Sequence, residues 1–266
     1  MSQMRETFAA ARAEGRAALI GYLPAGFPTL ADSVSLIEAM VENGVDIVEV
    51  GLPYSDPLMD GPVIQEAAER ALAAGCTTPH VLDVVQAVSR LGAPVTVMSY
   101  WNPIEQYGPQ RFAQELSAAG GAAVITPDII PEEAADWTSV TDEASIERIF
   151  LAAPSSTDER LESVVRSCSG FVYAASLMGV TGTRTSVSGA AEKLVTRLRP
   201  LTHLPIAVGL GVSTPAQARQ VAGYADGVIV GSAFVRRVLE GRNPREAARG
   251  VSQLAADLAE GVRAAG

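Results

Sequence analysis

The sequence has few histidines and cysteines, no long apolar run and no cluster of positive charge. Its 266 residues include only His80, His203, Cys76 and Cys168 of these two types, and none has a second ligand at zinc-site spacing, so we expect no metal and no disulfide. Both histidines are expected to be loop residues, with His80 at a probable helix start, which leaves proton transfer to Asp, Glu, Tyr or Lys. The net charge of −10 disfavours a nucleic-acid partner. The lack of a signal peptide and of a membrane-spanning run predicts a cytoplasmic protein without membrane contact.

Short runs rich in Val and Ile recur along the chain, and a segment with helical periodicity follows each of them. This alternation is typical of an α/β protein with a parallel sheet. Eight runs predict a (β/α)8 TIM barrel, formed by one domain that spans residues 1–266. The predicted strands are 18–23, 46–51, 95–100, 122–126, 148–152, 171–175, 206–209 and 227–231.

Helical patterns between these runs support the barrel. They cover 30–42, 109–119, 131–140, 187–198 and 215–222, and an extra N-terminal helix at 2–14 is expected to close the bottom of the barrel. The rival architecture is a doubly wound open sheet, which usually carries a glycine-rich G-x-G-x-x-G turn after its first strand. Pro24 and Pro28 occupy that place here, and this favours the closed barrel.

The second predicted strand carries an acidic residue, Glu49, on the face opposite to Val48 and Val50. If the valines pack under helices, Glu49 points into the mouth of the barrel. An unpaired carboxylate in an apolar interior is costly or takes up a proton, so its presence suggests a function. The alternative is a structural glutamate hydrogen-bonded to a neighbouring strand.

A long, proline-rich loop follows that strand and contains Asp56 and Asp60. Loops of this kind are often functional, and both carboxylates are candidates to face Glu49. Asp60 has an equal alternative, because Asp-Gly-Pro before Val63 is also a plausible helix start with Pro62 at the first position.

Glycines follow the predicted sixth, seventh and eighth strands, where barrels often bind phosphate. Their backbone N–H groups and a helix N-terminus can converge on one anion. Chain reversal is a strong alternative explanation for each glycine turn taken singly, and it weakens when three neighbouring loops share the feature. The polar stretch 176–186 has the composition of a lid that closes over a bound phosphate. The glycine turns are Gly179 to Gly182, Gly209 to Gly211 and Gly231 with Ser232.

Taken together, these residues closely resemble the tryptophan synthase alpha chain family over essentially the full length. The segment Glu-Val-Gly-Leu-Pro-Tyr-Ser-Asp-Pro-Leu-Met-Asp-Gly-Pro at 49–62 carries the resemblance, with support from 22–28, 98–104 and 179–183. The resemblance implies a lyase of L-tryptophan biosynthesis that cleaves indole-3-glycerol phosphate, by a retro-aldol reaction, into indole and glyceraldehyde 3-phosphate.

The resemblance also assigns roles to individual residues. It implies that Glu49 is the acid/base, that Asp60 binds the indole N–H and steadies positive charge on the ring, and that Tyr173 positions Glu49. By the same resemblance, Gly182, Gly211, Gly231 and Ser232 bind phosphate, Tyr22, Tyr100, Ile125 and Leu210 line the indole pocket, and Thr181 and Arg184 belong to the lid. Relatives often carry Phe where Tyr22 and Leu210 stand.

A partner is implied as well. Members of the family dock on a pyridoxal-phosphate beta chain in an allosteric α2β2 heterotetramer, and Pro53, Asp56 and Asn102 correspond to the docking surface. No cofactor is expected in this chain, because pyridoxal phosphate belongs to the beta chain. Three alternatives stay open: a stand-alone indole-3-glycerol-phosphate lyase, a non-catalytic barrel that acts only as an allosteric partner, and a sugar-phosphate isomerase barrel that shares only the phosphate loops.

Overall fold

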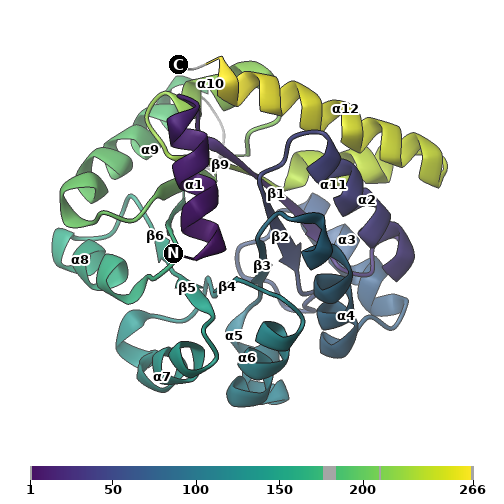
Figure 1. Ribbon diagram of the computed structural model, residues 1–266, viewed down its shortest axis with the longest axis horizontal. Coiled ribbons are helices and arrows are strands. Elements are labelled where there is room, and N and C mark those ends of the chain that lie inside the picture. The colour runs from purple at the N-terminus through teal and green to yellow at the C-terminus, as the bar shows by residue number, and fades with distance from the viewer. Residues whose placement is uncertain (1, 176–183, 210, 265–266) are drawn as a thin grey trace.

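Parallel strands form the centre of the molecule, and helices surround them (Figure 1). The computed structural model describes residues 2–175, 184–209 and 211–264. Its strands are β1 (Ala18–Pro24), β2 (Ile47–Gly51), β3 (Val95–Met98), β4 (Ala123–Ile125), β5 (Glu147–Ile149), β6 (Leu151–Ala152), β7 (Val172–Ala175), β8 (Ile206–Gly209) and β9 (Gly227–Val230). All pair in parallel in the order β5-β4-β3-β2-β1-β9-β8-β7-β6.

The two edge strands of this order, β5 and β6, follow each other directly in the chain, and this closes the sheet into a barrel. β5 ends at Ile149 and β6 begins at Leu151, so both belong to the single predicted strand 148–152. Phe150 interrupts it because its N–H donates to the sulfur of Cys168 at 3.3 Å, while its carbonyl accepts from the N–H of Tyr173 at 3.2 Å. β5 pairs with β4 and β6 pairs with β7. The eight predicted strands and the (β/α)8 barrel are therefore confirmed.

Twelve α-helices and three short 3₁₀ helices accompany the strands in the described residues. Thr29, Thr157, Thr214 and Asn243 each accept a backbone N–H at a helix start, which explains why these helices begin where they do. The α-helices are α1 (Gln3–Ala13), α2 (Leu30–Glu42), α3 (Pro62–Ala73), α4 (Thr78–Val88), α5 (Trp101–Tyr107), α6 (Pro109–Ala118), α7 (Ala135–Glu143), α8 (Asp158–Ser167), α9 (Arg184–Leu198), α10 (Pro215–Ala222), α11 (Ser232–Glu240) and α12 (Pro244–Arg263); the 3₁₀ helices are η1 (Ser89–Leu91), η2 (Pro131–Glu133) and η3 (Arg199–Leu201).

Three sequence-based expectations about helices need correction. The segment 131–140 is not one helix, because η2 precedes α7. The helix predicted at 187–198 begins at Arg184, inside the stretch assigned to a lid. His80 is not a loop residue: it lies in the first turn of α4, where its Nδ1 accepts the N–H of Thr77 at 3.2 Å. His203 does lie outside the helices and strands.

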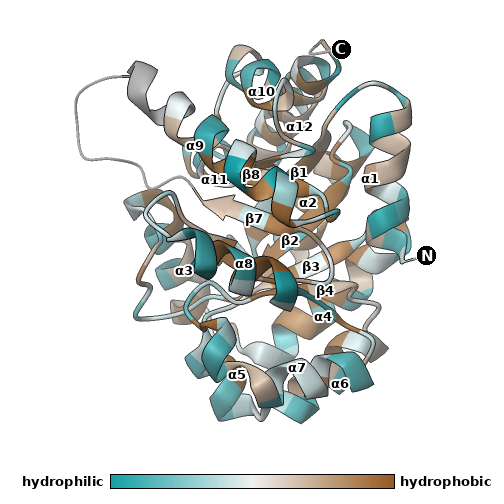
Figure 2. Cartoon of the chain, turned by 90° about the vertical axis from the view of Figure 1, so that its left-hand side faces the viewer, coloured by the Kyte–Doolittle hydropathy of each residue, from teal (hydrophilic) through white to brown (hydrophobic). Residues whose placement is uncertain are grey.

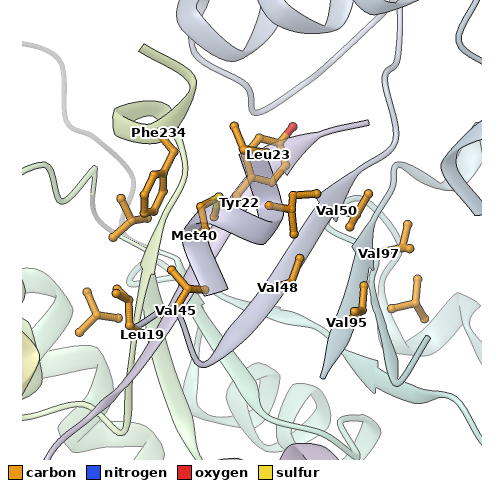
Figure 3. Packing of buried hydrophobic residues seen from close by; sticks show 14 of the residues in the cluster. Leu19, Tyr22, Leu23, Met40, Val45, Val48, Val50, Val95, Val97 and Phe234 are labelled. Atoms are coloured by element: carbon orange, nitrogen blue, oxygen red, sulfur yellow. The ribbon is translucent and has the colours of Figure 1, made fainter. Parts of the chain in front are cut away.

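Two layers of apolar side chains follow from the alternation along the strands. The outer layer lies between strands and helices, where Val48 and Val50 of β2 pair in register with Val95 and Val97 of β3 (Figure 3). The inner layer fills the barrel with Ile20, Ile47, Ala123, Ile125, Ile149, Phe171, Ala207 and Ile229. Figure 2 shows the corresponding division, with apolar colours on the strands and polar colours on the outer faces of the helices.

The N-terminal helix α1 lies across the end of the barrel at which the strands begin (Figure 1). Met4, Phe8 and Ala11 are buried and join the inner layer. The rings of Phe8 and Phe171 have centroids 5.7 Å apart. The interior of the barrel is therefore closed at this end, as predicted.

Candidate active site

A pocket of about 410 Å³ lies at the open end of the barrel. Residues of eight strands, β1 to β4 and β6 to β9, line it, and Tyr22, Glu49 and Tyr173 carry the polar side chains among them. The loop after β2 and the first turn of α3 cover one side with Met59 to Ile64, and the start of α11 forms part of the other. Because parallel strands all end on the same side, residues far apart in the sequence converge here.

Glu49 points into the barrel, as its place on β2 predicts. It stands in register between Tyr22 of β1 and Thr96 of β3, and it is 3% exposed. Its Oε2 has no hydrogen-bond partner among the described residues. Burial, together with the nearby charge of Asp60, raises the pKa of Glu49 to about 8. At neutral pH this carboxyl group is therefore mostly protonated and can donate a proton.

The position of Asp60 decides between the two interpretations of its sequence. α3 begins at Pro62 with Gly61 as N-cap, and none of the described side chains caps it. The carboxylate of Asp60 is thus not used to start the helix, and it lines the pocket instead. Gln65 holds the backbone by donating from Nε2 to the Asp60 carbonyl at 2.7 Å. Burial raises the pKa of Asp60, and the neighbouring hydroxyl of Tyr100 opposes that rise.

Tyr100 connects the loop after β2 to the loop after β3. Its hydroxyl accepts the N–H of Met59 at 3.0 Å, one residue before Asp60. Its ring is 2% exposed and lies 5.4 Å from the ring of Tyr54, measured between centroids. Because burial raises the pKa of Tyr100 to about 12, this hydroxyl stays neutral at physiological pH. It can therefore keep the Asp60 loop in place.

Two more tyrosines form the walls around Glu49. A Cβ on Gly51 would lie 2.4 Å from the hydroxyl oxygen of Tyr22, and a Cβ on Gly209 would lie equally close to that of Tyr173. Each ring therefore occupies space that only glycine leaves free. Burial, followed by the nearby carboxylates, raises the pKa of both tyrosines, so both stay neutral and can act as hydrogen-bond donors.

The opposite side of the pocket is suited to an anion. Gly211 has φ of +65°, a left-handed conformation that favours glycine. Gly231 is the N-cap of α11, Ser232 is its first residue, and no side chain within the described residues caps this start. All three line the pocket. Free N–H groups at a helix start carry partial positive charge and bind anions.

Some predicted residues cannot be placed. Thr181, Gly182 and Leu210 lie outside the described residues, as does the side chain of Arg184. Ile125 and Tyr22 line the pocket as predicted, whereas Tyr100 is nearby and acts through Met59.

The three predicted docking residues differ in exposure. Pro53 is buried within the chain, and Asp56 and Asn102 are exposed. Asn102 donates from Nδ2 to the hydroxyl of Tyr54 at 3.1 Å. Leu58, in the same loop as Asp56, is 78% exposed, which is unusual for a leucine.

Sequence reasoning missed several residues of the pocket. Leu151 and Ile229 line it and could have been found from alternation along their strands. Arg236 also lines it, and its spacing of four residues from Ser232 was the available signal.

In the described part of the chain, no group of three His, Cys, Asp or Glu side chains is placed so that it could hold a metal ion. Cys76 and Cys168 are both free and buried. Among the described helices, none combines the length and apolar character needed to cross a bilayer.

Comparison with known proteins gives a consistent result. The family described as tryptophan synthase alpha chain matches residues 8–263. A tryptophan synthase alpha chain from Thermobifida fusca is 59% identical, over 100% of this chain and 99% of its own length. A solved tryptophan synthase structure from M. tuberculosis is 48% identical with a TM-score of 0.91, covering 99% of both chains. Tryptophan synthase subunit alpha from Legionella pneumophila is 32% identical with a TM-score of 0.88, covering 98% of both.

Proposed function

Because this chain belongs to the tryptophan synthase alpha chain family, we propose that Glu49 and Asp60 carry out its chemistry in the pocket at the open end of the barrel. The chain is a lyase of tryptophan biosynthesis that cleaves indole-3-glycerol phosphate into indole and glyceraldehyde 3-phosphate. One observation supports the residue assignment above the others: Glu49 is a buried, mostly protonated carboxyl group that opens into this pocket.

Glu49 acts first as an acid and then as a base. Its proton goes to C3 of the indole ring, which leaves positive charge on the ring system. The resulting carboxylate takes the proton of the glycerol hydroxyl next to the ring, the carbon–carbon bond breaks, and its electrons neutralise the ring. Glu49 ends the cycle protonated, and the aldehyde leaves with the phosphate. A pKa of about 8 suits a group that must both donate and accept a proton near neutral pH.

Asp60 supplies the negative charge that faces the indole ring. Ionised, its carboxylate accepts the indole N–H and stabilises the positive charge that forms on the ring. Tyr173 positions the Glu49 carboxyl group, and Tyr22 and Ile125 hold the flat face of the indole. By resemblance, Leu210 belongs to the same apolar wall. Tyr100 contributes to the indole pocket by holding the Asp60 loop in place.

The phosphate of the substrate binds at the N-terminus of α11. Gly211, Gly231 and Ser232 offer backbone N–H groups there, and Gly182 is the fourth member of this set by resemblance. Thr181 and Arg184 belong to a lid that closes over the bound substrate. Closure excludes water, which strengthens the charge interactions inside the pocket.

The chain works with a tryptophan synthase beta chain in an α2β2 complex, and pyridoxal phosphate is the cofactor of that partner. We assign Pro53, Asp56 and Asn102 to the docking surface; the exposure of Asp56 and Asn102 supports this, and the buried Pro53 would shape the loop from within. We also propose that residues 1–266 form one domain and that the enzyme is located in the cytoplasm.

The test is a pair of isosteric substitutions. Glu49→Gln removes the transferable proton and should lower kcat for cleavage by about 10² to 10⁴, the range for general acid–base catalysis. Asp60→Asn should also be severe. Calorimetric titration of indole-3-glycerol phosphate into the inactive Glu49→Gln variant should give an affinity within a few-fold of the wild-type KM.

Glu69→Gln on the exposed face of α3 is the matched control, because it makes the same chemical change away from the pocket. Each variant is assayed for indole release with and without added beta chain. Wild-type activity in Glu49→Gln would refute the assignment of Glu49, and a chain that never cleaves this substrate would refute the function itself.

A further inference from the structure

One cationic side chain in the pocket wall, Arg236, has no role in the mechanism above. It lies on α11 four residues after Ser232, and both residues line the pocket. Residues four apart lie on the same face of a helix, and helical side chains lean toward the N-terminus. Arg236 therefore extends its guanidinium toward the end of α11 that opens into the pocket.

The charge of the pocket makes this arginine important. Arg236 is the only Lys, Arg or His among the described residues that line the pocket, which also holds Glu49 and Asp60. The whole chain has a net charge of −10. A phosphate monoester carries about −1.5 to −2 at pH 7, while a helix N-terminus supplies only about +0.5. Backbone groups alone therefore leave most of the phosphate charge unbalanced.

Arg236 is also not needed elsewhere in the described part of the chain. Its neighbour Arg237 pairs with Glu240 at 3.3 Å, and Arg242 pairs with Glu246 at 3.0 Å. Arg236 has no carboxylate partner at ion-pair distance among the described residues, and its side chain is exposed. A role in holding the fold together does not explain it.

We propose that Arg236 is a substrate-binding residue whose guanidinium pairs with the phosphate group of indole-3-glycerol phosphate and of the product glyceraldehyde 3-phosphate. The proposal rests on the proposed function, since it names the side chain that balances the charge of that substrate. The phosphate is remote from the bond that breaks and keeps its charge throughout the reaction. The pairing therefore affects binding of the ground state and the transition state equally, and it acts on KM rather than kcat.

The reverse reaction tests this because it separates the two halves of the substrate. The chain, together with a tryptophan synthase beta chain and without serine, condenses indole with glyceraldehyde 3-phosphate. Arg236→Gln should raise KM for glyceraldehyde 3-phosphate by about fivefold, the upper end of what loss of a charge-assisted contact at an exposed site costs. KM for indole and kcat should stay within about twofold. Arg236→Lys should keep most of the affinity because it keeps the charge.

Arg237→Gln is the matched control: it makes the same charge change one residue away on the same helix, outside the pocket wall. Equal KM for glyceraldehyde 3-phosphate in Arg236→Gln and Arg237→Gln overturns the proposal while leaving the lyase function intact. An equal loss in kcat and in both KM values also overturns it, because a structural defect would act in this way. Failure of the wild-type protein to catalyse either direction would instead refute the proposed function.

Discussion

Glu49→Gln should make the folded protein more stable at neutral pH while it abolishes catalysis. Glu49 is 3% exposed and its Oε2 has no hydrogen-bond partner among the described residues, so the folded state strongly disfavours the ionised form. The unfolded chain imposes no such penalty. Between the ordinary pKa of 4.5 and the folded pKa of about 8, the unfolded state therefore releases a proton that the folded state keeps.

The sign and size of the effect follow from this difference. The folded state binds more protons in that window, so the free energy of unfolding falls as pH rises. Each pH unit between the two pKa values lowers it by about 1.4 kcal/mol. The contribution of Glu49 is fully present below pH 4.5 and is fully lost above pH 8. Glutamine does not titrate, and the variant should therefore gain about 3 kcal/mol over the wild type between pH 4.5 and pH 7.

Urea denaturation of both proteins at pH 5.5, 6.5 and 7.5 measures this gain. The difference in the free energy of unfolding, variant minus wild type, should grow by roughly 1.4 kcal/mol at each step. Any pH-independent effect of the buried amide cancels when the three values are compared. Glu69→Gln, on an exposed surface, is measured in parallel as the control for the same chemical change outside the pocket. A constant difference across the series would mean that Glu49 is ionised in the folded protein, and the acid/base assignment would be refuted with it.

Two further outcomes are expected from the same groups. In wild-type protein, kcat/KM for cleavage should fall about tenfold per pH unit above pH 8, because the acid form of Glu49 is lost as pH rises through its pKa of about 8; a profile that stays flat to pH 9.5 would contradict this. Tyr100→Phe removes the acceptor for the N–H of Met59 and should cost about 1 kcal/mol of stability in urea denaturation and lower kcat roughly tenfold. Tyr54→Phe, whose hydroxyl accepts from Asn102 instead, is its control, and an equal loss of kcat in both variants would argue against a special role for Tyr100.

The strands of the barrel could be predicted from the sequence because each is a short apolar run that stays buried on both sides. The start of a helix could be predicted where the capping residue lies directly before it in the sequence, as at Thr29 and Thr214. The interruption at Phe150 could not be foreseen, because it depends on the sulfur of Cys168 on another segment. His80 was expected at a helix start, but as a loop residue; it lies inside the first turn because its ring takes part in capping the helix, which Thr78-Pro79 alone does not reveal.

The residues of the site also fall into those that the local sequence predicts and those that depend on distant segments. Alternation along β2 suffices to direct Glu49 inward, since the valines on either side of it must face the helices. Asp60 could not be settled by local rules, because an aspartate before Gly-Pro suits a helix start as well as a pocket. The side-chain hydroxyl of Tyr100 and the amide of Gln65, which hold its loop, come from separate elements. Arg236 was missed because one arginine on an amphipathic helix is ordinary until the pocket is known.

Two carboxyl groups in one pocket can perform different tasks only if their surroundings separate their protonation states. Glu49 achieves this from a strand, inside the barrel and away from water, where burial keeps it neutral. Asp60 stands on a loop and is only half-buried: burial raises its pKa as well, but the neighbouring hydroxyl of Tyr100 opposes that rise and favours the charged form. Ionised Asp60 in turn raises the pKa of Glu49 further. The same negative charge therefore stabilises the ring cation and keeps the acid protonated until the substrate arrives, which is why loss of either group should disable both steps.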